Sequence, residues 1–263
     1  MAGIYIHIPF CQRRCIYCDF FSTTQLERRE DYAHAIIAEF NDRRHLITEP
    51  IHTIYFGGGT PSLLHPEAIE GLISHAEALF DLSDVEEITI EANPDDITPQ
   101  YAEALRGVGV NRVSLGVQSF DDAELRFMNR RHTADAAEQA VRVLQDVGFD
   151  NITVDLIFGV DGFGEEVLHR SLQRVLALGV QHISAYHLTI EPATTFYRRV
   201  QRGQMREVAE ECSEREFLLI EKRLCEAGFE HYEVSNYALK GYRSQHNSSY
   251  WSGAEYLGIG AGA

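Results

Sequence analysis

Short runs of β-branched and aromatic residues alternate along this chain with longer segments of helical spacing, and this alternation restricts the fold more than any other feature. Strands that alternate with helices pair in parallel through right-handed crossovers, so the sequence predicts an open doubly wound sheet or a (β/α) barrel. Six strands are expected, over Ile4–Ile8, Thr53–Phe56, Glu87–Ala92, Arg112–Gly116, Ile152–Phe158 and His182–Leu188.

The clearest helix is expected over Ala134–Val147, whose apolar residues form one stripe that can pack on a sheet. Four glycines each follow a helical segment and precede an apolar one, as is typical of helix C-terminal caps: Gly109, Gly148, Gly179 and Gly228. The βα pattern ends near residue 190, and a further helix is expected over about 207–227. We therefore expect a barrel domain over residues 1–206 and an α+β C-terminal extension over residues 207–263.

The residues just past the predicted strands include nearly every distinctive short motif of the chain. Both candidate architectures place function at the carboxyl ends of their strands, so these segments are the candidate site. They are Pro9-Phe10-Cys11, Gly57-Gly58-Gly59-Thr60-Pro61, Asn93-Pro94, Gln118-Ser119-Phe120, Gly159 and Glu191-Pro192.

Three cysteines, Cys11, Cys15 and Cys18, form a C-x3-C-x2-C pattern directly after the first strand. Aromatic neighbours, Phe10, Tyr17, Phe20 and Phe21, suggest an apolar wrap that suits an iron–sulfur cluster. Three thiolates on four irons leave one iron open to a small molecule. One alternative is a zinc site with His7 as the fourth ligand, although structural zinc usually draws its ligands from two separated pairs. The other is a set of cysteines that bind no metal.

Cys212 and Cys225 are expected on the helix after residue 207, as buried small apolar residues rather than ligands. Five cysteines, three of them within eight residues, do not form a disulfide framework.

The charge balance narrows the class of partners. The chain has 23 Lys and Arg against 40 Asp and Glu, a formal charge of −17, and no block of basic residues. Nucleic-acid affinity comes mainly from cations that displace counterions, so we expect no nucleic-acid partner. Without a membrane-span pattern or a signal peptide, we expect a cytoplasmic protein.

The cysteine pattern, together with Gly57-Gly58-Gly59-Thr60-Pro61, resembles the radical S-adenosylmethionine (SAM) superfamily, whose core is a partial (β/α)6 barrel. More specific segments resemble the oxygen-independent coproporphyrinogen III oxidase-like family over essentially the whole chain. These segments are Tyr5-Ile6-His7-Ile8-Pro9-Phe10-Cys11, Glu91-Ala92-Asn93-Pro94, Gly116-Val117-Gln118-Ser119-Phe120, Asp155-Leu156-Ile157-Phe158-Gly159 and His246-Asn247-x-x-Tyr250-Trp251.

One departure from the family pattern concerns Phe20. The authentic dehydrogenase of this family has a further cysteine there, two residues after the third, and this chain has phenylalanine. Together with the segment from His246 to Trp251, this makes the chain resemble the heme chaperone branch, which is implied to bind heme and deliver it to heme-receiving proteins. The alternative is an oxygen-independent coproporphyrinogen III dehydrogenase. A radical-SAM RNA-modifying enzyme would need a basic RNA-binding module, which we do not find.

The resemblance also implies cofactors and their residues. Cys11, Cys15 and Cys18 would hold a [4Fe-4S] cluster, and SAM would chelate the open iron. Residues that match the family's positions for SAM, or for a second SAM, are Tyr5, Tyr17, Gly58, Gly59, Thr60, Glu91, Gln118, Arg130 and Asp155. Taken alone, the glycines could form a plain turn, Glu91 a solvated rim charge and Arg130 a helix cap.

His246, Tyr250 and Trp251 form the group most suited to heme, because imidazole is a common axial ligand and flat aromatic rings suit a porphyrin face. Without the family context, ordinary packing is the more frequent explanation of such residues. In the family the glycine-rich run from Gly258 to Ala263 continues into a C-terminal domain, so we expect the chain to be truncated. The full-length protein would then have room for a peripheral membrane association.

Overall fold

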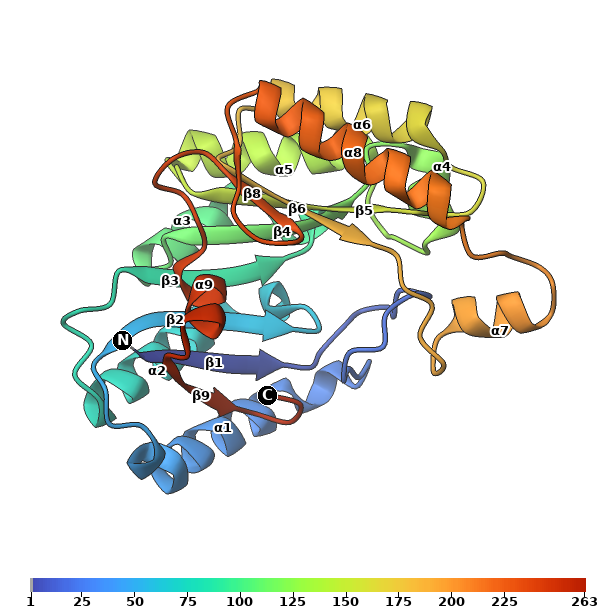
Figure 1. Ribbon diagram of the computed structural model, residues 1–263. Coiled ribbons are helices and arrows are strands. Elements are labelled where there is room, and N and C mark those ends of the chain that lie inside the picture. The colour runs from blue at the N-terminus through green and yellow to red at the C-terminus, as the bar shows by residue number, and fades with distance from the viewer. Residues whose placement is uncertain (1) are drawn as a thin grey trace.

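The computed structural model describes residues 2–263 and confirms the predicted α/β class (Figure 1). The nine strands of this part of the chain form one sheet in the order β7-β8-β6-β5-β4-β3-β2-β1-β9. Their bounds are β1 Ala2–Ile8, β2 Ile51–Gly58, β3 Glu87–Ala92, β4 Arg112–Gln118, β5 Ile152–Phe158, β6 His182–His187, β7 Glu230–His231, β8 Asn236–Ala238 and β9 Glu255–Ile259.

The helices alternate with the first six strands, as the sequence predicts. Their bounds are α1 Arg29–Arg43, α2 Pro66–Leu79, α3 Pro99–Gly107, α4 Asp122–Phe127, α5 Ala134–Val147, α6 Glu165–Ala177, α7 Thr195–Gln201, α8 Glu210–Glu226 and α9 Gln245–Ser252. The four predicted cap glycines all have left-handed backbone angles, with φ between 67° and 93°. Glycine is favoured there because a Cβ would clash with the chain.

The strands β1 to β6 are all parallel to their neighbours and point to the same end of the sheet, the right side of Figure 1. The sheet does not close, because β7 and β9 lie at opposite edges. A parallel, curved and open sheet of this kind is the predicted partial (β/α)6 barrel. The end where the strands finish is therefore the place to look for function.

Successive side chains of β1 point alternately to the two faces of the sheet. Ile4, Ile6 and Ile8 are fully buried in the main hydrophobic core, whereas Tyr5 and His7 point to the opposite, inner face. Burial of each isoleucine side chain contributes on the order of 1.5–3 kcal/mol. The outer face thus stabilises the fold and leaves the inner face free to carry polar and aromatic groups.

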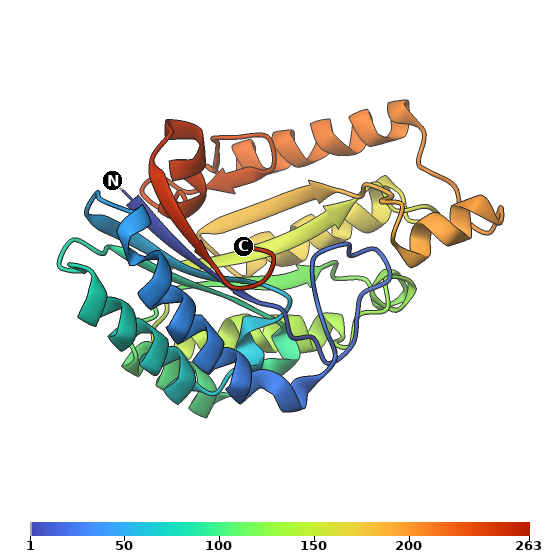
Figure 2. The same ribbon diagram turned by 90° about the horizontal axis from the view of Figure 1, so that it is seen from below.

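The segment after residue 206 joins the same sheet at both edges. Strand β8 pairs antiparallel with β6, and β9 pairs parallel with β1. Between them, α9 contacts β1 and β2. Figures 1 and 2 both show α9 on the face of the sheet opposite to α1 and α2, so it covers part of the inner face.

The expectation for the two isolated cysteines was right about the helix and wrong about burial. Both lie on α8, but Cys212 is half-buried and Cys225 is exposed. The buried stripe of α8 consists of Glu216, Ile220 and Leu224, four residues apart. Cys225 follows Leu224 by one residue and is therefore turned about 100° away from that stripe.

Candidate functional site

A cavity of about 430 Å³ lies at the carboxyl ends of the parallel strands. Its wall comes from β2 to β6 and from the segments that follow β1, β2, β3, β4 and β6. The wall includes eleven of the residues implied by the resemblance: Cys11, Cys15, Tyr17, Cys18, Gly58, Gly59, Thr60, Glu91, Gln118, Arg130 and Asp155. The topology thus gathers into one site residues that are up to 144 positions apart in the sequence, from Cys11 to Asp155.

The loop that carries the three cysteines is fixed by backbone hydrogen bonds at its base and at its far side. At the base, the Cys11 N–H donates to the Thr23 carbonyl (2.9 Å) and the Thr23 N–H donates to the Pro9 carbonyl (2.7 Å). At the far side, the Phe196 N–H of α7 donates to the Ile16 carbonyl (3.1 Å). The position of the thiols is therefore tied both to β1 and to α7.

Hydrogen-bond donors face two of the thiols. Arg130 Nη1 donates to Cys15 Sγ at 3.1 Å, and Thr60 Oγ1 donates to Cys11 Sγ at 3.6 Å. Burial raises the pKa of the Cys18 thiol to about 11. The thiolate form therefore needs a bound cation to compensate its burial. Across residues 2–263, no three His, Cys, Asp or Glu side chains converge around a single ion position.

The predicted aromatic wrap around the cysteines is only partly present. Phe10 is buried, and Tyr17 packs against Phe196 of α7. Phe20 and Phe21, in contrast, are 68% and 58% exposed, although Phe20 also lines the rim of the cavity. His7, the fourth ligand of the zinc alternative, does not line the cavity. Its ring accepts from the Tyr5 hydroxyl and donates to the Phe21 carbonyl.

The glycine-rich turn after β2 packs against the cysteine loop without room for side chains. A Cβ on Gly59 would lie 2.7 Å from the backbone of Pro9, and Gly58 has a φ of +114°. The Gly59 N–H donates to the Ile8 carbonyl at 2.8 Å. Two of the three glycines are therefore required by geometry, which a plain solvent-exposed turn would not demand.

Two carboxyl groups face the cavity, and no cationic side chain of the described part of the chain lies at hydrogen-bond distance from either. Glu91 accepts from the Tyr55 hydroxyl (2.8 Å) and from the Gly58 N–H (3.1 Å), and Asp155 accepts from the Ser114 hydroxyl. Burial raises the pKa of Glu91 to about 7 and that of Asp155 to about 6. Perturbed carboxyl groups in a concave site are typical of ligand-binding positions.

Unpartnered buried atoms surround the same space. Gln118 Oε1 and Arg130 Nε are buried and have no hydrogen-bond partner within residues 2–263, and Gln118 has a strained φ of +65°. The Arg130 Nη2 donates to Asn93 Oδ1 and to the Gly116 carbonyl. Buried polar groups without partners are costly, so their presence here fits a cavity shaped for a polar ligand.

The donor set in this cavity fits SAM beside a cluster. The carboxyl groups suit ribose hydroxyls, and a buried guanidinium together with closely approaching backbone suits an amino-acid carboxylate.

Sequence reasoning named Asn93 only as part of a motif, and it missed Tyr55 as the partner of Glu91. The motif Glu91-Ala92-Asn93-Pro94 was a usable signal for Asn93, whereas nothing in the strand sequence distinguished Tyr55.

The structure places four of the predicted residues outside the cavity: Tyr5, His246, Tyr250 and Trp251. The Tyr5 ring lies on the inner face of the sheet, stacked with the rings of Tyr55 and His246. His246 is fully buried, Tyr250 is 45% exposed and Trp251 is 74% exposed. The three residues of the predicted heme group therefore differ sharply in their access to solvent.

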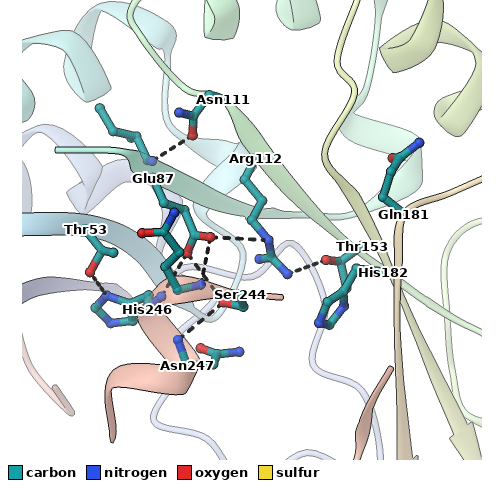
Figure 3. Close-up of polar contacts among 12 residues, drawn as sticks. Thr53, Glu87, Asn111, Arg112, Thr153, Gln181, His182, Ser244, His246 and Asn247 are labelled. Atoms are coloured by element: carbon teal, nitrogen blue, oxygen red, sulfur yellow. Dashed lines mark hydrogen bonds and ion pairs between the residues drawn. The ribbon is translucent and has the colours of Figure 1, made fainter. Parts of the chain in front are cut away.

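His246 is held from both sides by protein groups. Its Nδ1 lies 2.8 Å from Thr53 Oγ1, and its Nε2 lies 2.9 Å from the Tyr250 hydroxyl (Figure 3 shows the contact with Thr53). Burial, and then the positive charge of Arg112, lower the pKa of His246 to about 4. The imidazole is accordingly neutral at physiological pH, and neither ring nitrogen is open in this conformation.

A buried polar layer beneath α9 fixes the helix to the sheet (Figure 3). The Glu87 carboxylate accepts from the backbone N–H groups of Gln245 (2.9 Å) and His246 (3.0 Å), and it lies 3.9 Å from Arg112 Nε. Arg112 Nη2 donates to Thr153 Oγ1. The negative charge of Glu87 thus offsets both the partial positive charge at the N-terminus of α9 and the charge of the buried Arg112 guanidinium.

The chain is similar to known proteins over nearly all of its length. Residues 5–175 match the family model of the radical SAM superfamily. The chain is 40% identical to the "Heme chaperone HemW" of Lactococcus lactis over 98% of its length and 36% identical to that of Bacillus subtilis over 100%. It spans 68% and 70% of those two proteins.

Among solved structures, the coproporphyrinogen III oxidase HemN from Escherichia coli, described as a radical SAM enzyme, has a similar fold. The TM-score is 0.84 at 24% sequence identity. The match covers 99% of this chain and 63% of that enzyme.

In the part of the chain that the structure describes, no helix has the length and apolar character needed to span a bilayer.

Proposed function

Because the chain belongs to the radical SAM superfamily and, within it, to the family of the HemW heme chaperones, we propose that it binds a [4Fe-4S] cluster and SAM and passes heme to target proteins. The observation that carries the proposal is the cavity that gathers Cys11, Cys15 and Cys18 with Glu91 and Arg130. Family membership implies the cluster and SAM. Heme transfer by this chain is our inference.

In this proposal the three cysteines hold the cluster, and the cavity wall holds SAM beside its open iron. When bound, the pair supplies one-electron chemistry. The chain's own contribution is positioning: Gly58 and Gly59 allow close approach of the backbone, Arg130 supplies a fixed positive charge, and Glu91 supplies oxygens for hydroxyl groups.

Heme is proposed to bind at α9, where His246, Tyr250 and Trp251 lie on the inner side of the sheet. The exposed rings of Tyr250 and Trp251 suit the apolar face of a porphyrin. We further propose that residues 1–206 and 207–263 act as a barrel unit and an extension that completes it, since the extension adds a strand next to β6 and another next to β1. Heme-receiving proteins, rather than nucleic acids, are the proposed partners.

The test combines two measurements on anaerobically reconstituted protein. We expect saturable binding of ferric heme and no oxidation of coproporphyrinogen III to protoporphyrinogen IX with SAM under strict anoxia. The second expectation rests on Phe20, which stands where the dehydrogenases have a further cysteine. Absence of saturable heme binding would reject the chaperone function, and robust porphyrinogen turnover would establish the oxidoreductase in its place.

A further inference from the structure

Tyr250 is partly exposed to solvent and has an oxygen that can ligate iron. Neither His246 nor Trp251, the other two residues of the predicted heme group, combines these two properties. His246 is fully buried, and both of its ring nitrogens are engaged by Thr53 and Tyr250. Trp251 is 74% exposed, but an indole offers only an N–H donor. Of the three residues, Tyr250 is therefore the one that pairs a possible iron ligand, which is free of any second protein partner in residues 2–263 besides His246, with a partly exposed side chain.

We infer that Tyr250, and not His246, ligates the iron of bound ferric heme, and that His246 is a positioning residue for the phenol oxygen. This inference rests on the proposed heme chaperone function. Tyrosine is an established protein ligand of heme iron. On binding, the phenol O–H bond breaks and an Fe–O bond forms, while the hydroxide that ferric heme carries in water takes the proton and leaves as water.

The contacts of His246 suit this second role. The Thr53 hydroxyl lies 2.8 Å from Nδ1 and can donate to it, which leaves the hydrogen of the ring on Nε2, 2.9 Å from the Tyr250 oxygen. A phenolate accepts hydrogen bonds and has none to donate, so this arrangement is the one that survives ligation. A partner that fixes a ligand through its own hydrogen bond is common around bound metals.

A neighbouring tyrosine supplies a flat apolar surface beside this ligand. The Tyr256 ring is 52% exposed and stands edge-to-face with Tyr250, at a centroid distance of 5.2 Å and an angle of 90°. Tyr256 belongs to β9, and the exposed Trp251 follows Tyr250 on α9. An exposed aromatic ring beside the oxygen ligand, with a second exposed ring at the next position of α9, suits the porphyrin ring of heme, which is large, flat and mostly apolar.

Tyr256 also provides the matched control, because Tyr256→Phe keeps the aromatic ring and removes only the hydroxyl. It is a tyrosine of similar exposure on the same surface, but its hydroxyl has no histidine partner among the hydrogen bonds of residues 2–263. If any exposed tyrosine here could ligate heme iron, Tyr250→Phe and Tyr256→Phe would behave alike. If ligation instead needs the phenol oxygen that is hydrogen-bonded to His246, only Tyr250→Phe loses the iron ligand.

The experiment titrates ferric heme into anaerobically reconstituted protein and records resonance Raman and electron paramagnetic resonance spectra. An oxidised [4Fe-4S] cluster is diamagnetic, so the heme signal stands alone. We expect a high-spin ferric signal with phenolate ring modes in the original chain and in Tyr256→Phe. Tyr250→Phe should lose the phenolate modes and weaken heme binding at least about tenfold.

Two variants of His246 test the positioning role, with far-UV circular dichroism as the check on folding. His246→Gln keeps an N–H donor and should retain the phenolate modes, whereas His246→Leu should diminish them. The assignment is overturned if Tyr250→Phe keeps the spectrum of the original chain, or if the heme is low-spin and His246→Gln abolishes that signal. Both of these results leave heme binding intact, whereas no saturable binding by the original chain rejects the proposed function itself.

Discussion

The carboxylate of Glu87, the first residue of β3, accepts the backbone N–H of His246 at 3.0 Å and so joins the inner face of the barrel to the first turn of α9. The same carboxylate is the nearest anion to the buried Arg112 guanidinium. One side chain therefore holds the helix proposed to bind heme and balances the charge beneath it.

Glu87→Ala should lower the free energy of unfolding by about 3–5 kcal/mol, because it leaves Arg112 buried without an anion and the first N–H groups of α9 without an acceptor. Urea unfolding measures this change. Glu86→Gln is the control. Within residues 2–263 the Glu86 carboxylate accepts a hydrogen bond from the exposed Gln245 side chain alone, so the change in the free energy of unfolding should stay within roughly 0.5 kcal/mol. Equal effects of the two variants would refute the role of Glu87.

Glu91 should make stability depend on pH. Burial raises its pKa from 4.5 to about 7, so the folded state keeps the proton that the unfolded chain releases. The contribution of Glu91 to the free energy of unfolding is fully present below about pH 4.5 and is lost as the pH rises through about 7. Glu91→Gln should therefore be more stable than the original chain at pH 8, by on the order of 1–2 kcal/mol, with a difference that shrinks toward pH 5. A difference that does not change with pH would contradict this assignment.

Arg130→Gln should lower SAM affinity about tenfold or more, since a neutral side chain replaces the buried cation that borders the cavity. Isothermal titration of the reconstituted protein with SAM measures it. Arg131→Gln is the matched neighbour, because Arg131 is already paired with Asp95 and Asp96 at 2.9 and 3.0 Å. SAM affinity that falls equally in both variants would show a general loss of charge instead of a specific contact.

Gly59→Ala should reduce the iron and sulfide content of reconstituted protein. The new Cβ would lie within 2.8 Å of backbone atoms of Pro9 and Phe10, so the loop that carries Cys11 has to move. Gly71→Ala is the control in α2, where a Cβ meets nothing within 4 Å. It should leave the cluster intact and raise stability by roughly 0.5–1 kcal/mol. Full cluster content in Gly59→Ala would contradict the close packing of the two loops.

The sequence was most informative where the pattern of side chains is local. The bounds of α5 and β5 match their predictions because helical and strand periodicity act over neighbouring residues. The cavity residues could be grouped in advance because parallel strands bring their carboxyl ends together. The direction of Phe20 and Phe21 could not be predicted, since loop residues follow no periodic pattern.

Sequence patterns did not predict the contacts between segments that lie far apart in the chain. Strand β9 is short and contains Gly258, and its pairing with β1 across most of the chain leaves no local signal. Likewise, Thr53 and His246 lie 193 residues apart, and only the folded sheet brings them together. The predicted heme group therefore held three plausible residues, but their different burial emerged only from the tertiary structure.

The most direct test of the account is the electron paramagnetic resonance spectrum of the anaerobically reconstituted and reduced chain, recorded with and without SAM. If Cys11, Cys15 and Cys18 hold a four-iron cluster with one open iron in this cavity, the reduced protein gives the spin-½ signal of such a cluster, and SAM shifts its g values. A chain that binds zinc and gives no cluster signal, or a cluster signal that saturating SAM leaves unchanged, would contradict it.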